Sequence, residues 1–368
     1  NLTDKKDFIM KKIVLTGGGT AGHVTPNIAL LPALQAAGYE IAYVGSYEGI
    51  EKKLIADFNI PYTGISTGKF RRYLDPKNFS DPFRVMKGFV EARNYLKNYQ
   101  PDVVFSKGGF VSVPVVRAAA SLHIPCIIHE SDMTPGLANK LCIPVAEKVC
   151  CNFPETMKNI PADKAVLTGS PIRAELAQGS RLAGLNMCGF TANKPVIMVI
   201  GGSLGAANVN KAVRDALPKL LEDFQVVHLC GKDKIDNLLL NTPGYKQFEY
   251  IKAELKDIFA MADVVISRAG ANAICELLAL KKPNILIPLP AASSRGDQLL
   301  NAASFEAQGY SIVLNEDDIT TNLLVDKVHE LYFNRQNYVE AMSRSHQMDA
   351  INTIMLLINE AANKSHTQ

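Results

Sequence analysis

Long apolar runs are missing from this sequence. None reaches the roughly 18 residues that a membrane-spanning helix needs. The most apolar stretches, residues 28–38 and 195–209, are interrupted by proline, glycine or polar side chains. The sequence therefore predicts no membrane-spanning segment.

Excess charge and paired cysteines are also scarce. Lys and Arg number 39 against 36 Asp and Glu, which leaves a net charge of +3. Because the basic and acidic side chains nearly cancel, the chain has no general attraction to nucleic acid, and nucleic acid is not an expected partner. The seven cysteines are an odd number without a C-x-x-C spacing. This favours free, mostly buried thiols in a reducing compartment over disulfides.

Clusters with metal-ligand spacing are absent as well. The acidic run Glu316–Asp318 lacks partner ligands and is interpreted as a solvated turn rather than a cation site. Cys150 and Cys151 are neighbours on an expected strand, so their side chains point to opposite faces and cannot chelate together. Neither a metal nor a cofactor is expected.

The chain does have the length for two domains and a repeated alternation of strands and helices. Its 368 residues suggest two domains at about 150 residues each. Short runs rich in Val and Ile alternate with segments of helical period, which is typical of a parallel sheet covered by helices. The expected strands are residues 12–16, 41–45, 103–106, 126–129, 148–152 and 166–168, and then 196–200, 226–230, 264–267, 285–288 and 311–314.

The two halves begin alike, with "KIVLTGGGTAGHV" and "VIMVIGGSLGAANV". Each is an apolar strand, a glycine-rich turn and a helix. We expect an α/β fold of two facing Rossmann-like domains, residues 10–172 and 173–347, with the ligand in the cleft between them. Residues 173–194 contain three glycines and are interpreted as a linker. The last segment, 348–368, has apolar residues at helical spacing and is expected to pack back on the first domain.

The first glycine-rich turn has the spacing of an anion-binding loop. Gly17, Gly19 and Gly22 form G-x-G-x-x-G directly after a strand, where backbone N–H groups and the following helix can meet a diphosphate. A dinucleotide site also needs an acid at the end of the second strand. There the nearest acid is Glu48, beyond the strand end. A nicotinamide site is therefore disfavoured.

Two groups at the strand ends of the first half can transfer protons. His23 follows the glycine turn, where the helix dipole favours a neutral ring that can act as a general base. A helix-capping histidine is the alternative. Glu130 lies at the end of another strand, next to His129. Such positions hold catalytic groups in these folds, and surface solvation of Glu130 is the alternative.

Other strand ends carry groups suited to anions and sugars. Residues 106–110 offer backbone amides and the cation of Lys107, either for a second anionic group or as a tight turn with a solvated lysine. In the second half, residues 201–205 again present amides before a helix. Glu276 could take the hydroxyls of a ribose, or face solvent. Asp297 and Gln298 suit the vicinal hydroxyls of a sugar, although Asp297 could instead cap the next helix.

Residues 69–97 interleave aromatic and basic side chains. Apolar wedges beside cations are typical of a surface that lies on anionic lipid headgroups. Packing of these aromatics in the core is the alternative. The expected membrane patch comprises Phe70, Arg71, Arg72, Phe79, Phe83, Arg84 and Lys87.

Taken in order, the motifs resemble those of one family. The chain contains "TGGGTAGHVTPNIAL", "SKGGFVSVPVV", "IHESDMTPGLANK", "GSPIR", "GGSLGAANVN", "SRAGANAICE" and "DQLLNA". Together they resemble the MurG family, which transfers N-acetylglucosamine (GlcNAc) from UDP-GlcNAc to lipid I, undecaprenyl-pyrophosphoryl-MurNAc-pentapeptide, forming lipid II. The resemblance covers essentially the whole chain after Met10. It implies a GT-B fold, a donor site mainly in the second domain and an acceptor site in the first.

The resemblance also implies roles for individual residues. His23 and Glu130 become the candidates for activating the 4-hydroxyl of the acceptor. The acceptor's pyrophosphate would meet Gly18, Gly19, Lys107, Gly108 and Gly109. The residues implied for UDP-GlcNAc are Thr20, Ala21, Gly22, Asp132, Arg173, Ser203, Ile251, Arg268, Ala271, Asn272, Ala273, Glu276, Asp297 and Gln298. Ala21, Asp132 and Ser170 depart from the family pattern, and Asp132 puts a charge where an amide is common.

The expected function is that of an inverting glycosyltransferase in peptidoglycan synthesis, bound peripherally at the cytoplasmic face of the plasma membrane. Its expected partners are UDP-GlcNAc, lipid I and an anionic membrane surface. Other GT-B enzymes are the nearest rivals, with a diacylglycerol acceptor or as a UDP-GlcNAc epimerase. A nicotinamide-dependent dehydrogenase and a non-catalytic, nucleotide-binding scaffold at the membrane are more distant ones.

Overall fold

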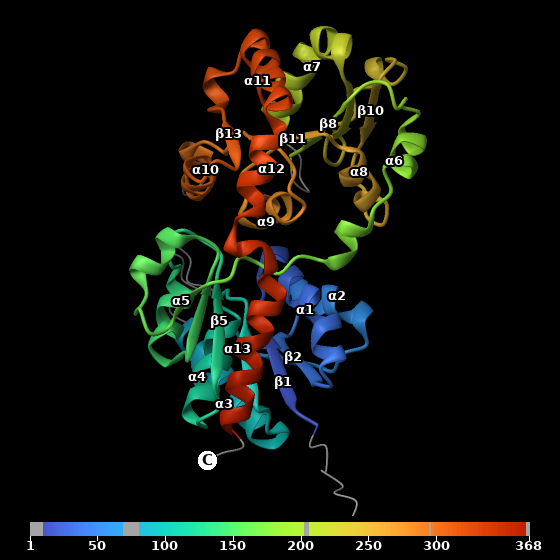
Figure 1. Cartoon of the computed structure of the whole chain (residues 1–368). Coiled ribbons are helices and arrows are strands. Elements are labelled where there is room, and N and C mark those ends of the chain that lie inside the picture. The colour runs from blue at the N-terminus through green and yellow to red at the C-terminus, as the bar shows by residue number, and fades with distance from the viewer. Residues whose placement is uncertain (1–9, 69–80, 202–205, 294–295, 366–368) are drawn as a thin grey trace, which may run out of the picture. The chain divides into compact units, whose positions relative to one another are not determined.

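The structure, a computed structural model, describes residues 10–68, 81–201, 206–293 and 296–365 (Figure 1). The chain forms two compact units. The first comprises residues 1–173 together with 349–368, and the second comprises residues 174–348. Each unit is built around its own parallel sheet.

The first sheet has the strand order β3-β2-β1-β4-β5-β6-β7. Every neighbouring pair is parallel, as in the register of Ile13 with Ile41 and with Val103. The chain reverses its direction of growth across the sheet between β1 and β4, which makes their carboxyl ends a ligand-binding position in such folds. The strands are β1 (Lys12–Thr16), β2 (Glu40–Ser46), β3 (Tyr62–Ile65), β4 (Val103–Ser106), β5 (Cys126–Glu130), β6 (Lys148–Cys151) and β7 (Ala165–Leu167).

Helices bury both faces of this sheet. Alternate residues of each strand point to opposite faces, so Ile13 and Leu15 pack with α1 and α13, whereas Val14 packs with α3, α4 and α5. Cys150 and Cys151 likewise lie in different cores. The helices of this unit are α1 (Thr25–Ala36), α2 (Ile50–Ile55), α3 (Asp81–Tyr99), α4 (Ser112–Ser121), α5 (Leu137–Cys142) and α13 (Ala350–Ser365).

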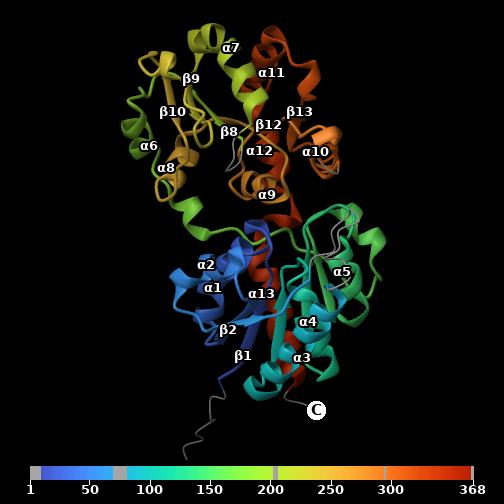
Figure 2. The ribbon, with the colours of Figure 1, turned by 180° about the vertical axis from the view of Figure 1, so that it is seen from behind.

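The last helix of the chain belongs to the first unit. Figures 1 and 2 show α13 running along the face of the first sheet that also carries α1. Ile354, Ile358 and Ala362 are buried there. Polar contacts at the border of this buried face also hold α13, including a hydrogen bond of 2.7 Å from the Tyr39 hydroxyl to the side-chain carbonyl of Asn359. Residues at the two ends of the chain therefore share one core.

The second sheet has the order β10-β9-β8-β11-β12-β13, again with parallel pairs throughout. One face packs against α7 and α11 through Val209, Val213 and Leu324. The strands are β8 (Val196–Ile200), β9 (Gln225–Leu229), β10 (Tyr245–Phe248), β11 (Val264–Ser267), β12 (Asn284–Leu286) and β13 (Ser311–Val313). The helices are α6 (Arg181–Cys188), α7 (Ala207–Asp223), α8 (Leu255–Met261), α9 (Ala271–Ala279), α10 (Asp297–Ala307), α11 (Thr321–Phe333) and α12 (Arg335–Ser343).

The expected linker at residues 173–194 is wrong. The segment contains α6, which packs against α8. A Cβ on Gly179 or Gly184 would collide with the backbone of Lys256 or Asp257. These two glycines therefore permit close packing and do not mark a linker.

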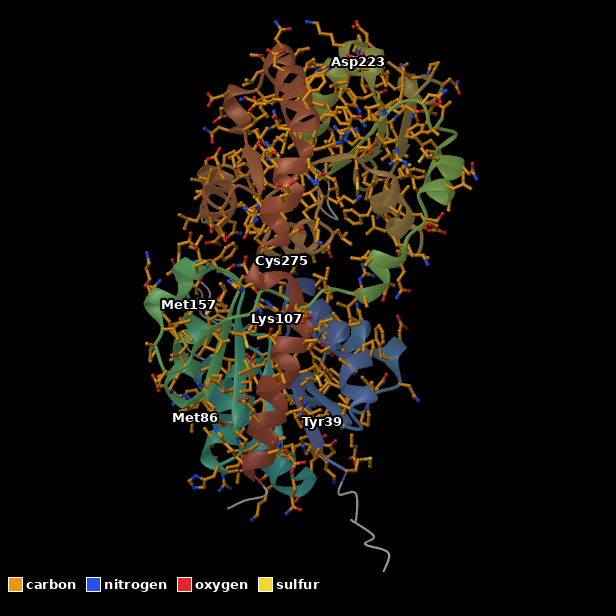
Figure 3. The ribbon with its side chains drawn as sticks, viewed as in Figure 1. Tyr39, Met86, Lys107, Met157, Asp223 and Cys275 are labelled. Carbon is orange, nitrogen blue, oxygen red and sulfur yellow. The ribbon has the colours of Figure 1, made fainter. Side chains whose placement is uncertain are left out.

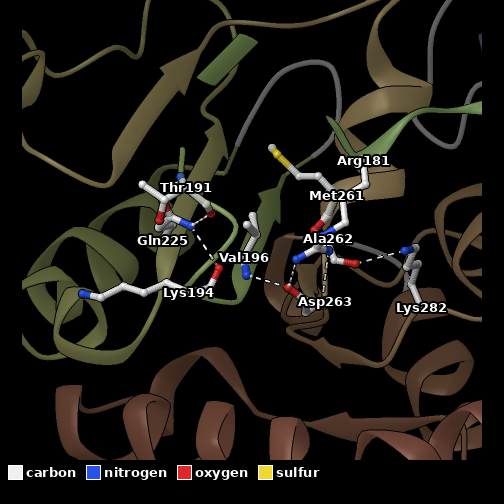
Figure 4. A network of polar contacts seen from close by, with 9 residues as sticks. All are labelled: Arg181, Thr191, Lys194, Val196, Gln225, Met261, Ala262, Asp263 and Lys282. Carbon is white, nitrogen blue, oxygen red and sulfur yellow. Dashed lines mark hydrogen bonds and ion pairs between the residues drawn. The ribbon is translucent and has the colours of Figure 1, made fainter. Parts of the chain in front are cut away.

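Polar contacts tie the same segment to the amino ends of the second sheet (Figure 4). The Arg181 guanidinium donates to the Met261 carbonyl at 2.7 Å and forms a two-point contact with the Asp263 carboxylate at 3.2 and 3.3 Å. Asp263 also accepts from the backbone N–H of Val196 at 2.8 Å, at the start of β8. Gln225 accepts from the N–H of Thr191 at 2.8 Å. The segment is thus an integral part of the second unit.

Two strands are missing from the sequence prediction. Both β3 and β10 lie at sheet edges. In β10, burial alternates along the strand, and Gly64 interrupts β3.

All seven cysteines are buried thiols. Among the residues that the structure describes, no helix has the length and apolar character to cross a membrane.

Candidate functional site

In the first unit, three loops gather at the carboxyl end of the sheet. They follow β1, β4 and β5, which are neighbours in the sheet. The N–H of Gly18 donates to the carbonyl of Gly108 at 3.3 Å, which joins the first two loops. A Cβ on Gly109 would overlap the Gly18 carbonyl, so the close approach of these loops requires glycine there. The sequence prediction thus places both glycine loops correctly at adjacent strand ends.

His23 lies in the loop after β1, on a short 3₁₀ turn (Ala21–His23) before α1. The N-terminal cap of α1 is Val24, so the helix-capping alternative for His23 is wrong. Its Nδ1 is 2.9 Å from the hydroxyl of Thr20. Burial, followed by the positive charge of Lys107, lowers the pKa of His23 to about 4. The neutral ring therefore has a different main cause from the expected helix dipole.

Lys107 is a buried cation at the start of the loop after β4 (Figure 3). The side chain is only 1% exposed, which excludes the alternative of a solvated lysine. Its ammonium group donates to the hydroxyl of Ser131, in the loop after β5. The charge also contributes to a lowered pKa of His129, whose main cause is complete burial.

Glu130 is a buried carboxylate at the end of β5, with 3% exposure, so the solvated alternative is wrong here too. One oxygen accepts from the N–H of Asp132 at 2.8 Å. The other accepts from Gly136 N–H at 3.2 Å and the Asn139 amide at 2.8 Å. Burial raises the pKa of Glu130 to about 7, although these hydrogen bonds oppose the shift. The carboxylate therefore connects the two ends of the loop after β5, at Asp132 and Gly136, to Asn139 on α5.

Sequence reasoning missed several polar residues that support these loops. Asn139 also donates to the His129 carbonyl at 3.1 Å. The Tyr43 hydroxyl donates to the Gly17 carbonyl at 2.6 Å. The fully buried Glu51 accepts from the N–H of Gly19, whereas Glu48, the acid noticed in the sequence, is exposed. Asn139 lies within a motif that was singled out, but no spacing signal marks Glu51.

In the second unit, a pocket of about 410 Å³ opens at the carboxyl end of the sheet. The loops after β8, β11 and β12 and the start of α7 form it. The predicted Arg268, Ala273 and Gln298 come together in its lining, and Glu316 joins them. Gly270 at the start of α9 places backbone N–H groups at the pocket, a suitable arrangement for a phosphate group.

Arg268 is held by a buried ion pair. Its guanidinium contacts the Glu316 carboxylate, and it donates to the carbonyls of Ile287 at 3.1 Å and Pro288 at 3.3 Å. Asn208 donates to the other oxygen of Glu316 at 2.5 Å. The Glu316 side chain is only 9% exposed. The interpretation of this residue as part of a solvated turn is therefore wrong.

Gln298 connects two of the pocket loops. Its side-chain carbonyl accepts from Leu289 N–H at 2.9 Å and Ala269 N–H at 3.3 Å. This directs its amide nitrogen toward Gly270. The N-terminal cap of α10 is Gly296, with φ 81°, so the alternative role of Asp297 as that cap is wrong.

The remaining predicted positions are placed as follows. Ala271, Asn272, Ala273 and Glu276 lie on α9, all partly buried. Ile251 follows β10 in a partly buried loop, and Arg173 ends the first unit. Ser203 lies outside the described residues. No group of His, Cys, Asp or Glu side chains that could hold a metal ion occurs within the described residues.

Part of the expected membrane patch is visible on α3. Phe83, Met86 and Val90 are 79%, 63% and 52% exposed, at helical spacing, and Arg84 and Lys87 lie between them in the sequence. Figure 3 labels Met86. Phe89 instead packs against the core of the first unit. Phe70, Arg71, Arg72 and Phe79 lie outside the described residues. An exposed apolar stripe with flanking cations therefore exists on this helix.

Comparison with known proteins decides the family. Residues 13–151 match the glycosyltransferase family 28 N-terminal domain, and residues 196–355 match the glycosyltransferase family 28 C-terminal domain. The chain belongs to glycosyltransferase family 28. It is therefore a glycosyltransferase, and the family's N-terminal match contains His23, Lys107 and Glu130.

Curated relatives match almost the full chain. A protein of Lachnospira eligens is 64% identical over 351 residues, which cover 95% of this chain and 99% of the relative. A protein of Lachnoclostridium phytofermentans has the same identity and coverage. Both are named UDP-N-acetylglucosamine--N-acetylmuramyl-(pentapeptide) pyrophosphoryl-undecaprenol N-acetylglucosamine transferase. The resemblance to the MurG family is thus confirmed.

Solved structures agree on the fold. MurG of Acinetobacter baumannii aligns with a TM-score of 0.75 at 28% identity, covering 95% of this chain and 99% of that one. A UDP-GlcNAc 2-epimerase of Neisseria meningitidis aligns with a TM-score of 0.67 at 13% identity, covering 95% and 100%. The predicted GT-B fold of two Rossmann-like domains is confirmed. Because an epimerase shares it, the fold alone does not select the reaction.

Proposed function

We propose that this family 28 chain transfers GlcNAc from UDP-GlcNAc to the 4-hydroxyl of MurNAc in lipid I, which yields lipid II for peptidoglycan synthesis. The observation that carries the proposal is the 64% identity to transferases with this name, over 99% of their length. The two sets of strand-end loops support it, since a transferase needs one site for the donor and one for the acceptor.

The donor belongs to the pocket of the second unit. Backbone N–H groups of the loop after β8 and of the start of α9 meet the diphosphate of UDP. Glu276 on α9 accepts from the ribose hydroxyls, and Ile251 contacts the uracil. Gln298 is suited to the sugar because its carbonyl is engaged with Leu289 and Ala269, which leaves its amide to donate. Asp297 accepts from a second hydroxyl of GlcNAc.

Arg268 acts differently from a mobile phosphate-binding arginine. Its guanidinium is fixed against Glu316 and two carbonyl groups beside the pocket. Such an arginine supplies a rigid wall at no cost of ordering when UDP binds, and Glu316 offsets its charge. Arg173 and Thr20 to Gly22 complete the contacts to the donor.

The acceptor belongs to the loops of the first unit. In the loop after β4, Gly109 offers its backbone N–H to the pyrophosphate, and the buried charge of Lys107 lies behind it. The N–H groups of Gly18 and Gly108 instead donate to the Gly108 carbonyl and the Ser106 hydroxyl. An anion here gains from a preorganised positive environment. Asp132, beside the same loops, stays the proposed contact from this unit to the donor sugar.

His23 is the proposed general base. It is partly exposed, whereas Glu130 is buried and accepts two hydrogen bonds from its own loop and one from Asn139 on α5. The acceptor's 4-oxygen attacks the anomeric carbon from the side opposite UDP while its proton passes to His23. The bond from the anomeric carbon to the UDP oxygen breaks, and UDP leaves with both bonding electrons. The anomeric configuration is therefore inverted.

The stripe on α3 places the enzyme at its lipid substrate. Phe83, Met86 and Val90 can enter the headgroup region while Arg84 and Lys87 meet anionic lipids. The bound surface is the cytoplasmic face of the plasma membrane, where a nucleotide sugar is available, and the attachment is peripheral.

Measurement of UDP release tests the proposal. UDP-GlcNAc is incubated with a lipid I analogue, with a diacylglycerol, or with neither. The proposal predicts release that depends on the lipid I analogue. Release with diacylglycerol alone would support another GT-B transferase, and formation of an epimerised UDP-sugar without acceptor would support an epimerase. Binding of UDP-GlcNAc with no release in any mixture would indicate a non-catalytic scaffold.

A further inference from the structure

The loop after β1 rests on a buried carboxylate. Glu51, near the start of α2, is fully buried. Its Oε2 accepts from the N–H of Gly19 at 3.1 Å. Its Oε1 accepts from the N–H of Ser46 at 2.9 Å and from the Ser46 hydroxyl. One carboxylate therefore connects the loop that carries His23 to the end of β2.

The surrounding backbone leaves space for this carboxylate. A Cβ on Gly18 would lie 2.5 Å from both Cδ and Oε2 of Glu51, and one on Gly49 would overlap Oε1. Gly49 has φ −74°, a conformation that any residue adopts. The lack of a side chain at Gly49 is therefore explained by the room that Glu51 and Ser46 occupy.

Burial of a carboxylate is costly unless it is hydrogen-bonded. Here both oxygens have partners, and hydrogen bonds to a charged acceptor are about twice as strong as neutral ones. The arrangement thus fixes the Gly19 peptide firmly. Because that N–H points at Glu51, it is directed away from any substrate.

We propose that Glu51 is a positioning residue for the transfer reaction, which holds the loop of residues 17–23 so that His23 meets the acceptor hydroxyl. This inference rests on the proposed function. It also revises the expected role of Gly19, whose N–H serves Glu51 and not the acceptor's pyrophosphate. Since the N–H of Gly18 donates to the Gly108 carbonyl, the anion is left to the loop that begins at Lys107.

The negative charge of Glu51 also favours the proposed role of His23 as a base. It raises the pKa of that ring, against the lowering by burial and by Lys107. His129, on β5, is the other titratable group that interacts with His23. A stronger base at His23 accepts the acceptor's proton more readily. Glu51 therefore supports both the position and the basicity of the ring.

The test compares Glu51→Gln with the matched control Glu48→Gln. Both remove one negative charge, but Glu48 is exposed and only three positions away. Glu51→Gln replaces the acceptor at Gly19 or at Ser46 with an amide donor. We expect faster hydrogen exchange at the Gly19 amide in Glu51→Gln and no change in Glu48→Gln. We also expect kcat to fall about 10- to 100-fold, since misplacement by about 1 Å can cost 100-fold. The Kd for UDP should change less than kcat, because most of the proposed donor contacts lie in the second unit.

A milder variant keeps the test decisive if Glu51→Gln fails to fold. Ser46→Ala removes one hydroxyl donor to Glu51, and we expect the same changes at smaller size, about 3- to 10-fold in kcat. Unchanged exchange at Gly19 in both variants, or unchanged kcat in a folded variant, would overturn the inference. Exchange is measured without substrate, so it tests Glu51 separately. Absence of turnover in the unmodified enzyme would instead count against the proposed function.

Discussion

The pH dependence of the transfer distinguishes the two candidate bases. A general base works only when deprotonated, so its contribution is lost as the pH falls through its pKa. The pKa of His23 is lowered to about 4, and that of Glu130 is raised to about 7. The same buried loops thus shift the pKa values of the two groups in opposite directions. The pH ranges in which the two candidate bases would lose activity on acidification are therefore well separated.

The expected size follows from these values. Between pH 8 and pH 5, a base with a pKa of about 4 loses roughly 10% of its deprotonated form, whereas one with a pKa of about 7 loses about 100-fold. Because we propose His23 as the base, the fall in kcat/KM over this range should stay well below 100-fold. Protonation of Glu130 leaves its carbonyl oxygen as an acceptor, so the loop at Asp132 keeps part of its support.

The assay is kcat/KM for the lipid I analogue across this pH range, with the unmodified enzyme, Glu130→Gln and His23→Ala. Glu130→Gln resembles the protonated acid and should keep at least about a tenth of the activity. His23→Ala should lose about 100- to 10,000-fold, the usual contribution of a general base, with UDP affinity retained. A 100-fold fall with a midpoint near pH 7, together with loss of activity in Glu130→Gln and not in His23→Ala, would refute the assignment.

Three further predictions concern packing and attachment. Ile358→Ala, in the fully buried face of α13, should destabilise the protein by about 2–5 kcal/mol in chemical denaturation, and a loss below about 1 kcal/mol would contradict the packing of α13 on the first sheet. Asp263→Ala removes the acceptor of Arg181 and Val196 and should lower the free energy of unfolding by about 1–3 kcal/mol. The control Asp215→Ala, in the exposed pair with Lys211, should lower it by less than about 1 kcal/mol. Equal losses would refute the structural role given to residues 173–194. Phe83→Ser with Met86→Ser should weaken sedimentation with anionic vesicles at least about tenfold, while Leu356→Ser on α13 should not, and equal effects would count against the α3 stripe as the attachment surface.

The sequence predicts the central part of each sheet well because these strands are buried on both faces. β1, β4, β8 and β11 have the predicted bounds, and β8 is the unbroken apolar run Val196–Ile200. The edge strands β3 and β10 lack such runs, since one side of an edge strand meets solvent or a loop. Their assignment depends on pairing with distant strands, which a local pattern does not contain.

Glycine was the least reliable guide to organisation. Before His23 it correctly predicts a tight turn at a strand end, and Gly19 has φ 85°, which side chains rarely adopt. At Gly179 and Gly184 it marks close contact between backbones in a packed segment. A sequence alone does not separate these two uses, because the difference lies in the neighbour that approaches.

The site was predictable where chemistry lies on the strand-end loops themselves. The sequence places His23, Lys107 and Glu130 at strand ends, as the structure does, whereas Gln298 lies in the first turn of α10 and not on a loop. The roles of all four stay predictions. Glu51 and Glu316 were not, because each acts through a partner far along the chain, Gly19 and Arg268 respectively. An acid on a short helix or in an acidic turn resembles an ordinary solvated side chain until the fold brings its partner close.

The structure of the reaction product tests the central claim most directly. After incubation of UDP-GlcNAc with a lipid I analogue, the mass and the anomeric configuration of the glycosylated lipid are measured by mass spectrometry and NMR. The account predicts one added N-acetylhexosamine on the MurNAc 4-oxygen, in inverted configuration, with one UDP formed per product. A product with retained configuration, a sugar on another oxygen, or UDP formed without any glycosylated lipid would contradict it.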